Sequence, residues 1–536
     1  MGATPKPSQP GFTYSLKSDR PSRRTTASSP RGLARSTAVW LLLFAGGWIL
    51  LHYTLYDRNR QDERSGAALE AVAAPTLLEP TATSSCEVCH LDPTNPLCRY
   101  GLDNIRMSRA YEASGHRLRK VLRRALDGEK IGVGILGASV TLGHGVPPGG
   151  QRWEDRWFED FQKAFPTAEM HVGAAPAMDS QFFACCASAV VPMDLDIYIV
   201  ELDINNDGSF NTMKSDDALM RGLMQLPQEP AVLRVSVFAL VLEDLLRGTA
   251  STLMTSQLFD VPVISLRPFM LPHVIRHREA SDDMFSKDPA GNIDLRHISE
   301  LSHTILGDML SLYTQKEICE TRRRELFSEL ETARGPWIQP TELGMVPNAT
   351  LWDSWMTPKP PRIVMPLCQS LASQLSPLTP ISHSKAFKIE TWHDKSAWAA
   401  AVPGAQIRLR FTGSWVGLFV YVTNGDSPVE RSSDPIVRRT SAPGQATCWI
   451  EDPTADLYDE EDEGGEEEPP VDPEKKTGDD AIFIVNSHFP NREAAGFEFI
   501  ELSDSLSTGE HILACEVSKE TTSGGYKWRV QGIASL

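Results

Sequence analysis

Residues 131–145 read IGVGILGASVTLGHG, and this stretch decides the fold. Its first six residues are a short apolar run, which is typical of a buried strand. Gly137 and Ala138 then carry Ser139 into a turn. In an open parallel sheet the ligand site lies beyond the carboxyl ends of the strands. The stretch therefore predicts a serine presented at the edge of such a sheet.

Strands and helices alternate on both sides of this stretch. The apolar spacing predicts helices over 116–127, 216–226 and 299–313. Between them lie apolar runs that predict strands at 131–136, 169–172, 195–202, 231–240 and 261–266. Alternating helices and nearly continuous apolar strands favour a parallel sheet that is covered on both faces.

Two further polar motifs follow in the chain. Asn205 comes directly after the strand at 195–202, and Asp294 and His297 form an Asp-x-x-His motif that we expect in a late loop. We expect all of them to meet Ser139 at the carboxyl edge of the sheet.

These residue types fit the chemistry of a serine esterase. His297 is the candidate base that takes the proton of Ser139, and Asp294 can hold the imidazole by its other nitrogen. The oxyanion that forms needs fixed donors, which the side-chain amide of Asn205 and the backbone N–H of Ser139 can supply.

The last part of the chain, residues 386–536, has the pattern of an all-β domain. Strand-like runs separated by turn residues occur at 406–411, 416–423, 446–451, 481–487, 497–502, 511–517 and 526–533. This pattern predicts an antiparallel sandwich. Cys448 and Cys515 lie in two of these runs, and we expect them to form a disulfide. The strongly acidic stretch 457–476 is expected to be a disordered loop, with calcium binding as the alternative.

The amino-terminal residues predict a membrane anchor. Residues 1–36 are a basic arm rich in Pro, Ser and Thr, and residues 37–56 are about 20 residues without a formal charge, long enough to span a bilayer. A polar and Ala/Thr/Pro-rich stem, 57–85, follows. The positive-inside rule places the arm in the cytosol and the rest across the membrane, in the lumen of the ER or Golgi or at the cell surface. The alternative is a cleaved signal peptide.

The cysteines and the charge restrict the partners. All nine cysteines follow residue 56, where an oxidising lumen would favour disulfides. Cys86 and Cys89 form a C-x-x-C motif, for which zinc binding is the alternative. Asn348 begins a glycosylation sequon, Asn-Ala-Thr. The formal net charge of −18, without a dominant basic patch in the folded region, argues against nucleic acid.

Taken together, the motifs resemble the SGNH (GDSL-type) hydrolases, specifically membrane-anchored members from fungi and algae that carry a carboxy-terminal β-sandwich. The resemblance rests on GASVTLGHG at 137–145, IVEL at 199–202, DVPVISLR at 260–267 and LSH at 301–303, and in the last part of the chain on FTGSWVG at 411–417 and GEHILACE at 509–516. It implies a flavodoxin-like three-layer hydrolase domain at 86–319, a connector at 320–385, and ester chemistry without a cofactor or a metal.

The family also implies a third oxyanion donor in the loop after the second strand. That loop usually contains Asn-x-x-x-x-Gly, and here Val172 and Ala177 stand at those two positions. The backbone N–H of Ala177 remains eligible, with Gly173 as the second candidate. Asn206 stands where the family usually has Asp.

The expected function is that of a serine esterase or O-acyltransferase of the secretory pathway that acts on esters, in particular O-acetyl groups, of glycans. The alternatives are an inactive glycan-binding protein and an esterase of lipids or small esters. Relatives of this fold act on many esters, so the fold does not choose among them.

Overall fold

The computed structural model of the 536-residue chain describes residues 85–536, apart from 242–244, 246–248, 289, 328–342, 355, 358–360, 362–364, 393, 452, 454–481 and 493–494. The expected basic arm, membrane span, nearly all of the stem and the acidic loop lie outside the described residues. None of the helices in the described part is long and apolar enough to span a bilayer.

The first part of the chain is built on a six-stranded sheet in the order β1-β6-β5-β4-β2-β3. Its strands are β1 (Arg109–Tyr111), β2 (Gly132–Gly137), β3 (Glu169–Ala174), β4 (Ile197–Glu201), β5 (Ala231–Ser236) and β6 (Val263–Ser265). The last five are parallel, and β1 pairs antiparallel with β6 at one edge. Without β1 this is the flavodoxin-like order 2-1-3-4-5, and all five strands that the apolar runs predicted are present.

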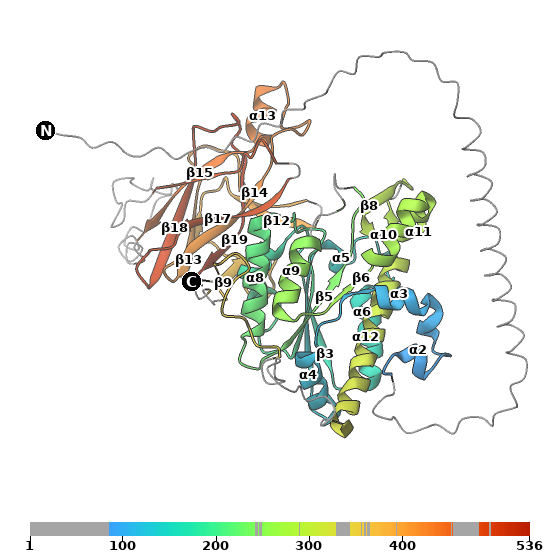
Figure 1. Cartoon of the computed structure of the whole chain (residues 1–536). Coiled ribbons are helices and arrows are strands. Elements are labelled where there is room, and N and C mark those ends of the chain that lie inside the picture. The colour runs from blue at the N-terminus through green and yellow to red at the C-terminus, as the bar shows by residue number, and fades with distance from the viewer. Residues whose placement is uncertain are drawn as a thin grey trace, which may run out of the picture. The chain divides into compact units, whose positions relative to one another are not determined.

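Helices cover both faces of this sheet, as the apolar strands require (Figure 1). One face carries α4 (His116–Leu126), α6 (Trp153–Ala164) and α12 (Glu300–Phe327), and both α4 and α6 pack on α12. The opposite face carries α7 (Ser180–Val190), α8 (Phe210–Met224) and α9 (Thr249–Phe259). The helix expected at 299–313 continues to Phe327, so it passes the expected domain boundary at residue 319.

The stretch expected as a late loop is partly regular. After β6 come α10 (Arg267–Arg276), η2 (Arg278–Ala280) and α11 (Ser281–Met284), and then a two-stranded sheet of β7 (Phe285–Lys287) and β8 (Ile293–Ile298). The Asp-x-x-His motif therefore lies on a strand, which corrects the expected loop. The expectation failed because β8 has six residues and pairs with β7, which has three, so the strand is short and depends on this one pairing.

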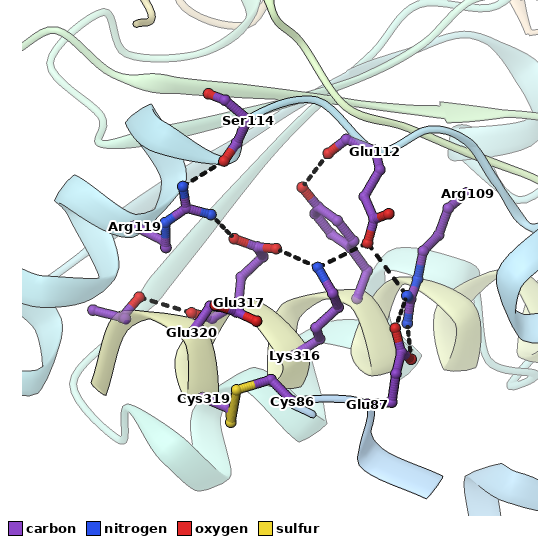
Figure 2. A network of polar contacts seen from close by, with 12 residues as sticks. Cys86, Glu87, Arg109, Glu112, Ser114, Arg119, Lys316, Glu317, Cys319 and Glu320 are labelled. Carbon is purple, nitrogen blue, oxygen red and sulfur yellow. Dashed lines mark hydrogen bonds and ion pairs between the residues drawn. A yellow bond between two sulfur atoms is a disulfide. The ribbon is translucent and has the colours of Figure 1, made fainter. Parts of the chain in front are cut away.

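The segment before the sheet is fastened to α12. It contains α2 (Val88–Leu91), η1 (Pro96–Tyr100) and α3 (Leu102–Met107), and the disulfide Cys86–Cys319 ties its start to the helix. Figure 2 shows a chain of charged contacts beside this disulfide: Arg109 binds Glu87 at 2.5 Å, Lys316 binds Glu112 at 2.7 Å and Arg119 binds Glu317 at 2.6 Å. Segments that are far apart in the chain are thus held together by both covalent and ionic contacts.

The last part of the chain is all-β, and its two sheets share one apolar core and form a sandwich. One sheet has the order β10-β13-β18-β15-β16, and the other has the order β11-β12-β19-β14-β17, with β9 also paired to β19. The bounds are β9 (Leu367–Ser370), β10 (Ser382–His383), β11 (Lys388–Trp392), β12 (Lys395–Ala400), β13 (Gln406–Thr412), β14 (Val416–Val422), β15 (Gln445–Glu451), β16 (Phe483–Asn486), β17 (Gly496–Ser503), β18 (Glu510–Val517) and β19 (Trp528–Ser535), with α13 (Pro435–Ser441) between β14 and β15.

All seven predicted strands of this part are present, and four more precede them. Strands β9 and β10 lie in the stretch expected as a connector, so the sandwich takes up part of it. Cys448 on β15 faces Cys515 on β18 in register, and the two form the predicted disulfide.

The two parts share one apolar cluster. Phe182 of α7 packs edge-on against Phe419 of β14, with ring centroids 5.3 Å apart, and both rings are buried. The disulfide Cys186–Cys368 joins α7 to β9, and Ser373 donates a hydrogen bond to the carbonyl of Ala189. The face of the sandwich that carries β14 is therefore fixed to the helices of the α/β part.

Disulfide bonds of Cys86 and Cys89 exclude the zinc alternative for this motif. Cys86 is bonded to Cys319 and Cys89 to Cys98, so the C-x-x-C motif contributes to two disulfides. Cys185 is the free thiol among the described cysteines. Asn348 of the sequon is exposed.

Candidate active site

Ser139 stands directly beyond β2, at the first residue of the one-turn helix α5 (Ser139–Leu142). Its exposed fraction is 9%, so it has little contact with water. The loop after α5 turns sharply, because Gly143 and Gly145 have φ values of 96° and 93°, a region that favours glycine. The sequence GASVTLGHG thus supplies a strand end, a one-turn helix and a tight return.

His297 and Asp294, both on β8, complete the expected arrangement. His297 Nε2 lies 3.0 Å from Ser139 Oγ, and His297 Nδ1 lies 2.5 Å from Asp294 Oδ2. When Nδ1 carries the ring proton and donates it to Asp294, Nε2 is free to accept from the serine hydroxyl. Side chains three residues apart point to opposite faces of a regular strand. Here β8 is irregular, since its register against β7 shifts between Phe285 and Ser286, and Asp294 and His297 can meet.

Burial and charge act in opposite directions on this pair. Burial lowers the pKa of His297, and the hydrogen bond and charge of Asp294 offset part of that shift. Partial burial acts to raise the pKa of Asp294, but the hydrogen bonds from the His297 side chain and the Arg296 N–H outweigh it, so this pKa is lowered. At neutral pH the pair is therefore a neutral imidazole and a carboxylate, which is the state that a general base requires.

Two backbone donors stand at the same edge of the sheet. Among the described residues, no acceptor is recorded for the N–H of Ser139 or of Ala177. Ala177 follows β3 in a turn with φ 61°, a left-handed conformation that costs a non-glycine residue about 1 kcal/mol. This conformation gives the physical reason why glycine is usual at this position in the family that the sequence resembles.

Gly173, the second candidate for the same role, is not placed to donate into the site. The structure extends β3 to Ala174, two residues beyond the predicted strand, so Gly173 lies inside it. The N–H of Glu169 donates to the carbonyl of Ile131, just before β2, and the N–H of Ala175 donates to the carbonyl of Gly137, the last residue of β2. Every second residue of β3 donates to β2 in this way, and Gly173 is one of them. Its N–H is therefore directed at β2, which corrects the expectation.

Asn205 follows β4 and is half-buried, and its side chain has no recorded hydrogen bond to any described residue. The next residue is firmly held: Asn206 is fully buried, and its Oδ1 accepts from the N–H and Oγ of Ser180 at 3.0 and 2.9 Å. Ser180 Oγ also contacts Asp216, which forms an ion pair with Arg234 at 2.7 Å. This network fixes the loop that carries Asn205.

A buried carboxyl group accepts hydrogen bonds from the turn that carries Ser139. Glu201, the last residue of β4, is fully buried and accepts from Thr141 Oγ1 at 3.0 Å and from the Ala138 N–H at 3.4 Å. Burial raises its pKa to about 8. In the sequence Glu201 was recognised only as part of a strand end. The signal that could have found it is an acid inside an apolar strand, where a charge rarely stays unpaired.

Two more titratable groups lie buried near this turn. Burial raises the pKa of Glu154, on α6, to about 8, although Arg152 lies 3.1 Å away. Burial lowers the pKa of His303 to about 4, and its Nδ1 accepts from the Trp153 N–H at 3.2 Å. Between about pH 4 and pH 8 the side chains of Glu201, Glu154 and His303 are therefore mostly in their neutral forms.

The arrangement has the parts that acyl transfer needs. A hydroxyl contacts a neutral imidazole, the imidazole contacts a carboxylate, and backbone N–H groups without other acceptors lie at the same edge of the sheet. Within the described residues, no group of three or more His, Cys, Asp or Glu side chains could hold a metal ion.

Comparison with known proteins identifies the fold. No protein-family model matches the sequence, and no curated protein matches it significantly. A solved two-domain esterase active on acetylated mannans, co-crystallised with mannopentaose, is similar over 80% of this chain and 97% of its own, with 15% identity and a TM-score of 0.50. An acetyl xylan esterase is similar over 33% of this chain and 97% of its own, with 15% identity and a TM-score of 0.27. The first likeness shows that the α/β part and the all-β part together have the fold of a two-domain esterase.

Proposed function

We propose that this protein is a serine esterase of the SGNH type that removes acyl groups, in particular acetyl groups, from glycans. The observation that carries the proposal is the relay from Ser139 through His297 to Asp294, with contacts of 3.0 and 2.5 Å. The glycan substrate is supported by the fold shared with an esterase active on acetylated mannans. At 15% identity that substrate is a proposal for this chain.

In the first half of the reaction, Ser139 Oγ attacks the acyl carbonyl carbon while its proton passes to His297 Nε2. The carbonyl π electrons move to oxygen, and the N–H groups of Ser139 and Ala177 and the amide of Asn205 bind the oxyanion that forms. When the intermediate collapses, the bond to the sugar oxygen breaks, and His297 returns its proton to that oxygen. The sugar leaves as an alcohol, and the acyl group stays on Ser139.

In the second half, water loses a proton to His297 and attacks the acyl carbon. The bond from that carbon to Ser139 Oγ then breaks, and His297 returns the proton to Oγ, so that carboxylic acid and free Ser139 result. A hydroxyl of a second glycan in place of water would make the same enzyme an O-acyltransferase. Asp294 keeps the imidazole oriented and stabilises the imidazolium in both halves.

Release of acetate from acetylated mannan and from p-nitrophenyl acetate tests the proposal. Wild-type protein should release acetate, and Ser139→Ala should lose nearly all of this turnover, because nucleophile and base act as one unit. Ser505→Ala, at an exposed serine of the sandwich, is the matched control and should be unchanged. Wild-type protein that binds mannan and releases no acetate would favour the glycan-binding alternative. Turnover only on lipid or other small esters would favour the third alternative.

We further propose that residues 37–56 anchor the protein as a single-pass type II membrane protein, with the esterase in the lumen or at the cell surface. The four disulfides are in keeping with an oxidising compartment. Protease treatment of sealed microsomes should leave a carboxy-terminal tag intact, and glycosidase should shift the mobility of the protein through Asn348. Loss of the tag without detergent would contradict this topology.

A further inference from the structure

The loop that follows Ser139 presses His144 against the strand of the candidate base. The His144 N–H donates to the Ser139 carbonyl at 2.9 Å. A Cβ on Gly145 would lie 2.3 Å from the carbonyl oxygen of Ile298, the residue after His297. The backbone of His144 is therefore held in close contact with both β8 and the serine turn.

The side chain of His144 makes two contacts. Its ring centroid lies 4.9 Å from that of His297, edge-on at 74°. Its Nε2 lies 2.7 Å from Asp394 Oδ2. With the proton on Nε2, His144 donates to Asp394, and a line of contacts runs from Asp394 through His144 to the ring of His297.

Asp394 belongs to the sandwich, 250 residues further along the chain than His144. It lies in the turn between β11 and β12, where Trp392 pairs with Lys395, and its φ of 49° is left-handed. Strand β12 pairs with β19, so the turn is anchored in the sheet that packs on α7. The position of Asp394 is therefore set by how the sandwich docks on the α/β part.

Lys395 gives a second sign that this turn lies beside the candidate base. It is half-buried, and burial followed by the charge of Arg296 lowers its pKa. Arg296 directly precedes His297 on β8. The turn is thus close to β8 through two neighbouring residues, Asp394 and Lys395.

The imidazole of His297 needs more than one restraint. The Asp294 side chain that holds Nδ1 is 37% exposed, and one hydrogen bond leaves the ring free to tilt about it. Contact with the His144 ring limits this tilt, provided that His144 is itself held. Among the described residues, Asp394 holds the His144 side chain through the contact at Nε2.

We propose that Asp394 is a positioning residue of the active site, supplied by the sandwich. By accepting from His144 Nε2 it keeps the His144 ring against His297, so that His297 Nε2 stays aimed at Ser139 Oγ. The sandwich then completes the catalytic arrangement instead of serving only as a separate module. This inference rests on the proposed role of Ser139 and His297.

The test compares Asp394→Ala with Asp394→Asn in the full chain, with p-nitrophenyl acetate as substrate. Loss of the acceptor should lower kcat about 10-fold or more, by analogy with side chains that orient metal ligands, whose loss typically costs about 10- to 100-fold, and KM should stay within about twofold. Asparagine keeps an oxygen at the same place, so Asp394→Asn should retain at least about a third of kcat. Asp504→Ala, at an exposed aspartate between β17 and β18, is the control and should match wild type.

A double-mutant cycle shows whether Asp394 acts through His144. In a His144→Ala background, Asp394→Ala should have no further effect on kcat, because the route is already broken. The Asp394 side chain is 55% exposed in wild type, so unchanged thermal unfolding of its variants separates positioning from folding. A kcat unchanged in Asp394→Ala, an effect confined to KM, or equal losses in Asp394→Ala and Asp394→Asn would each overturn the inference.

These outcomes are distinct from failure of the proposed function. If wild-type turnover depends on Ser139 but not on Asp394, only the positioning role is wrong. If wild type shows no turnover that depends on Ser139, the proposed function is wrong, and the role of Asp394 falls with it.

Discussion

Replacing Glu201 by glutamine should change the pH dependence of stability in a calculable way. Glu201 is fully buried beneath the serine turn, where Oε2 accepts from Thr141 and Ala138 and Oε1 has no recorded partner among the described residues. Oε1 is therefore where a proton, or the amide nitrogen of a glutamine, can lie. The side chain introduced by Glu201→Gln should reproduce the shape of the protonated acid, and it cannot ionise.

The magnitude follows from the pKa of Glu201 in the two states. Burial raises it to about 8 in the folded protein, against the ordinary 4.5 that applies when the chain unfolds. Between these values the unfolded state binds fewer protons than the folded state, so stability falls as pH rises, by about 1.4 kcal/mol per pH unit. The contribution is fully present below pH 4.5 and is lost as pH rises towards 8, with roughly 3 kcal/mol lost by pH 7.

Urea unfolding at pH 5.0 and pH 7.5, followed by tryptophan fluorescence, measures this directly. Trp153 and Trp157 report on the α/β core. At pH 5.0 the unfolding free energy of Glu201→Gln should be within about 1 kcal/mol of the wild-type value. Between pH 5.0 and pH 7.5 the wild type should lose about 3 kcal/mol more of its unfolding free energy than Glu201→Gln does. Glu520→Gln, at an exposed glutamate, is the control and should follow wild type at both pH values.

One result would refute the reasoning. If Glu201→Gln and wild type lose the same stability between pH 5.0 and pH 7.5, Glu201 is ionised in the folded protein and burial does not dominate its pKa. The neighbouring Glu154, whose pKa is also raised to about 8, remains in both proteins, so the effect of its burial is common to both.

The site and the junction between the two parts yield three further predictions. Because burial lowers the pKa of His297, the acid limb of kcat/KM should have its midpoint below the usual 6.5, and a pH profile with a midpoint near 7 would contradict this. Asn205→Ala should lower kcat by about 10²–10³, the effect of losing one oxyanion donor, and a steady-state rate within about threefold of wild type would remove Asn205 from that role. Replacing Cys186 and Cys368 together by Ser should cost about 2–5 kcal/mol in unfolding free energy. Peptide mapping without reduction should find this pair linked in wild type, and finding both thiols alkylated would show the link to be absent.

Local patterns in the sequence were enough to predict the α/β part and the residues that meet in the candidate site. The apolar runs at 131–136 and 195–202 are buried strands because their side chains face helices on both sides of the sheet. The rule that sites lie beyond the carboxyl ends of parallel strands then brought Ser139 to the correct edge. The spacing of Asp294 and His297 identified the pair, although not the strand that carries it.

Other features depended on where strands end and pair. The sequence predicted a strand at 169–172, but β3 continues to Ala174, and this difference of two residues turns the N–H of Gly173 into the sheet. The buried acid Glu201 was visible as a residue type in an apolar run. Only its contacts with Thr141 and Ala138 show that it supports the serine turn.

What the sequence by itself determined was local: which segments form strands and helices, that an all-β part follows an α/β part, and which residues form the candidate site. These follow from periodicity and from residue types at strand ends, over spans of a few residues. Only the tertiary structure decided that Cys86 bonds to Cys319, that Cys186 bonds to Cys368 and that Asp394 meets His144. Such contacts join residues 182 to 250 positions apart, and they depend on how finished sheets and helices pack against each other, which no local pattern along the chain encodes.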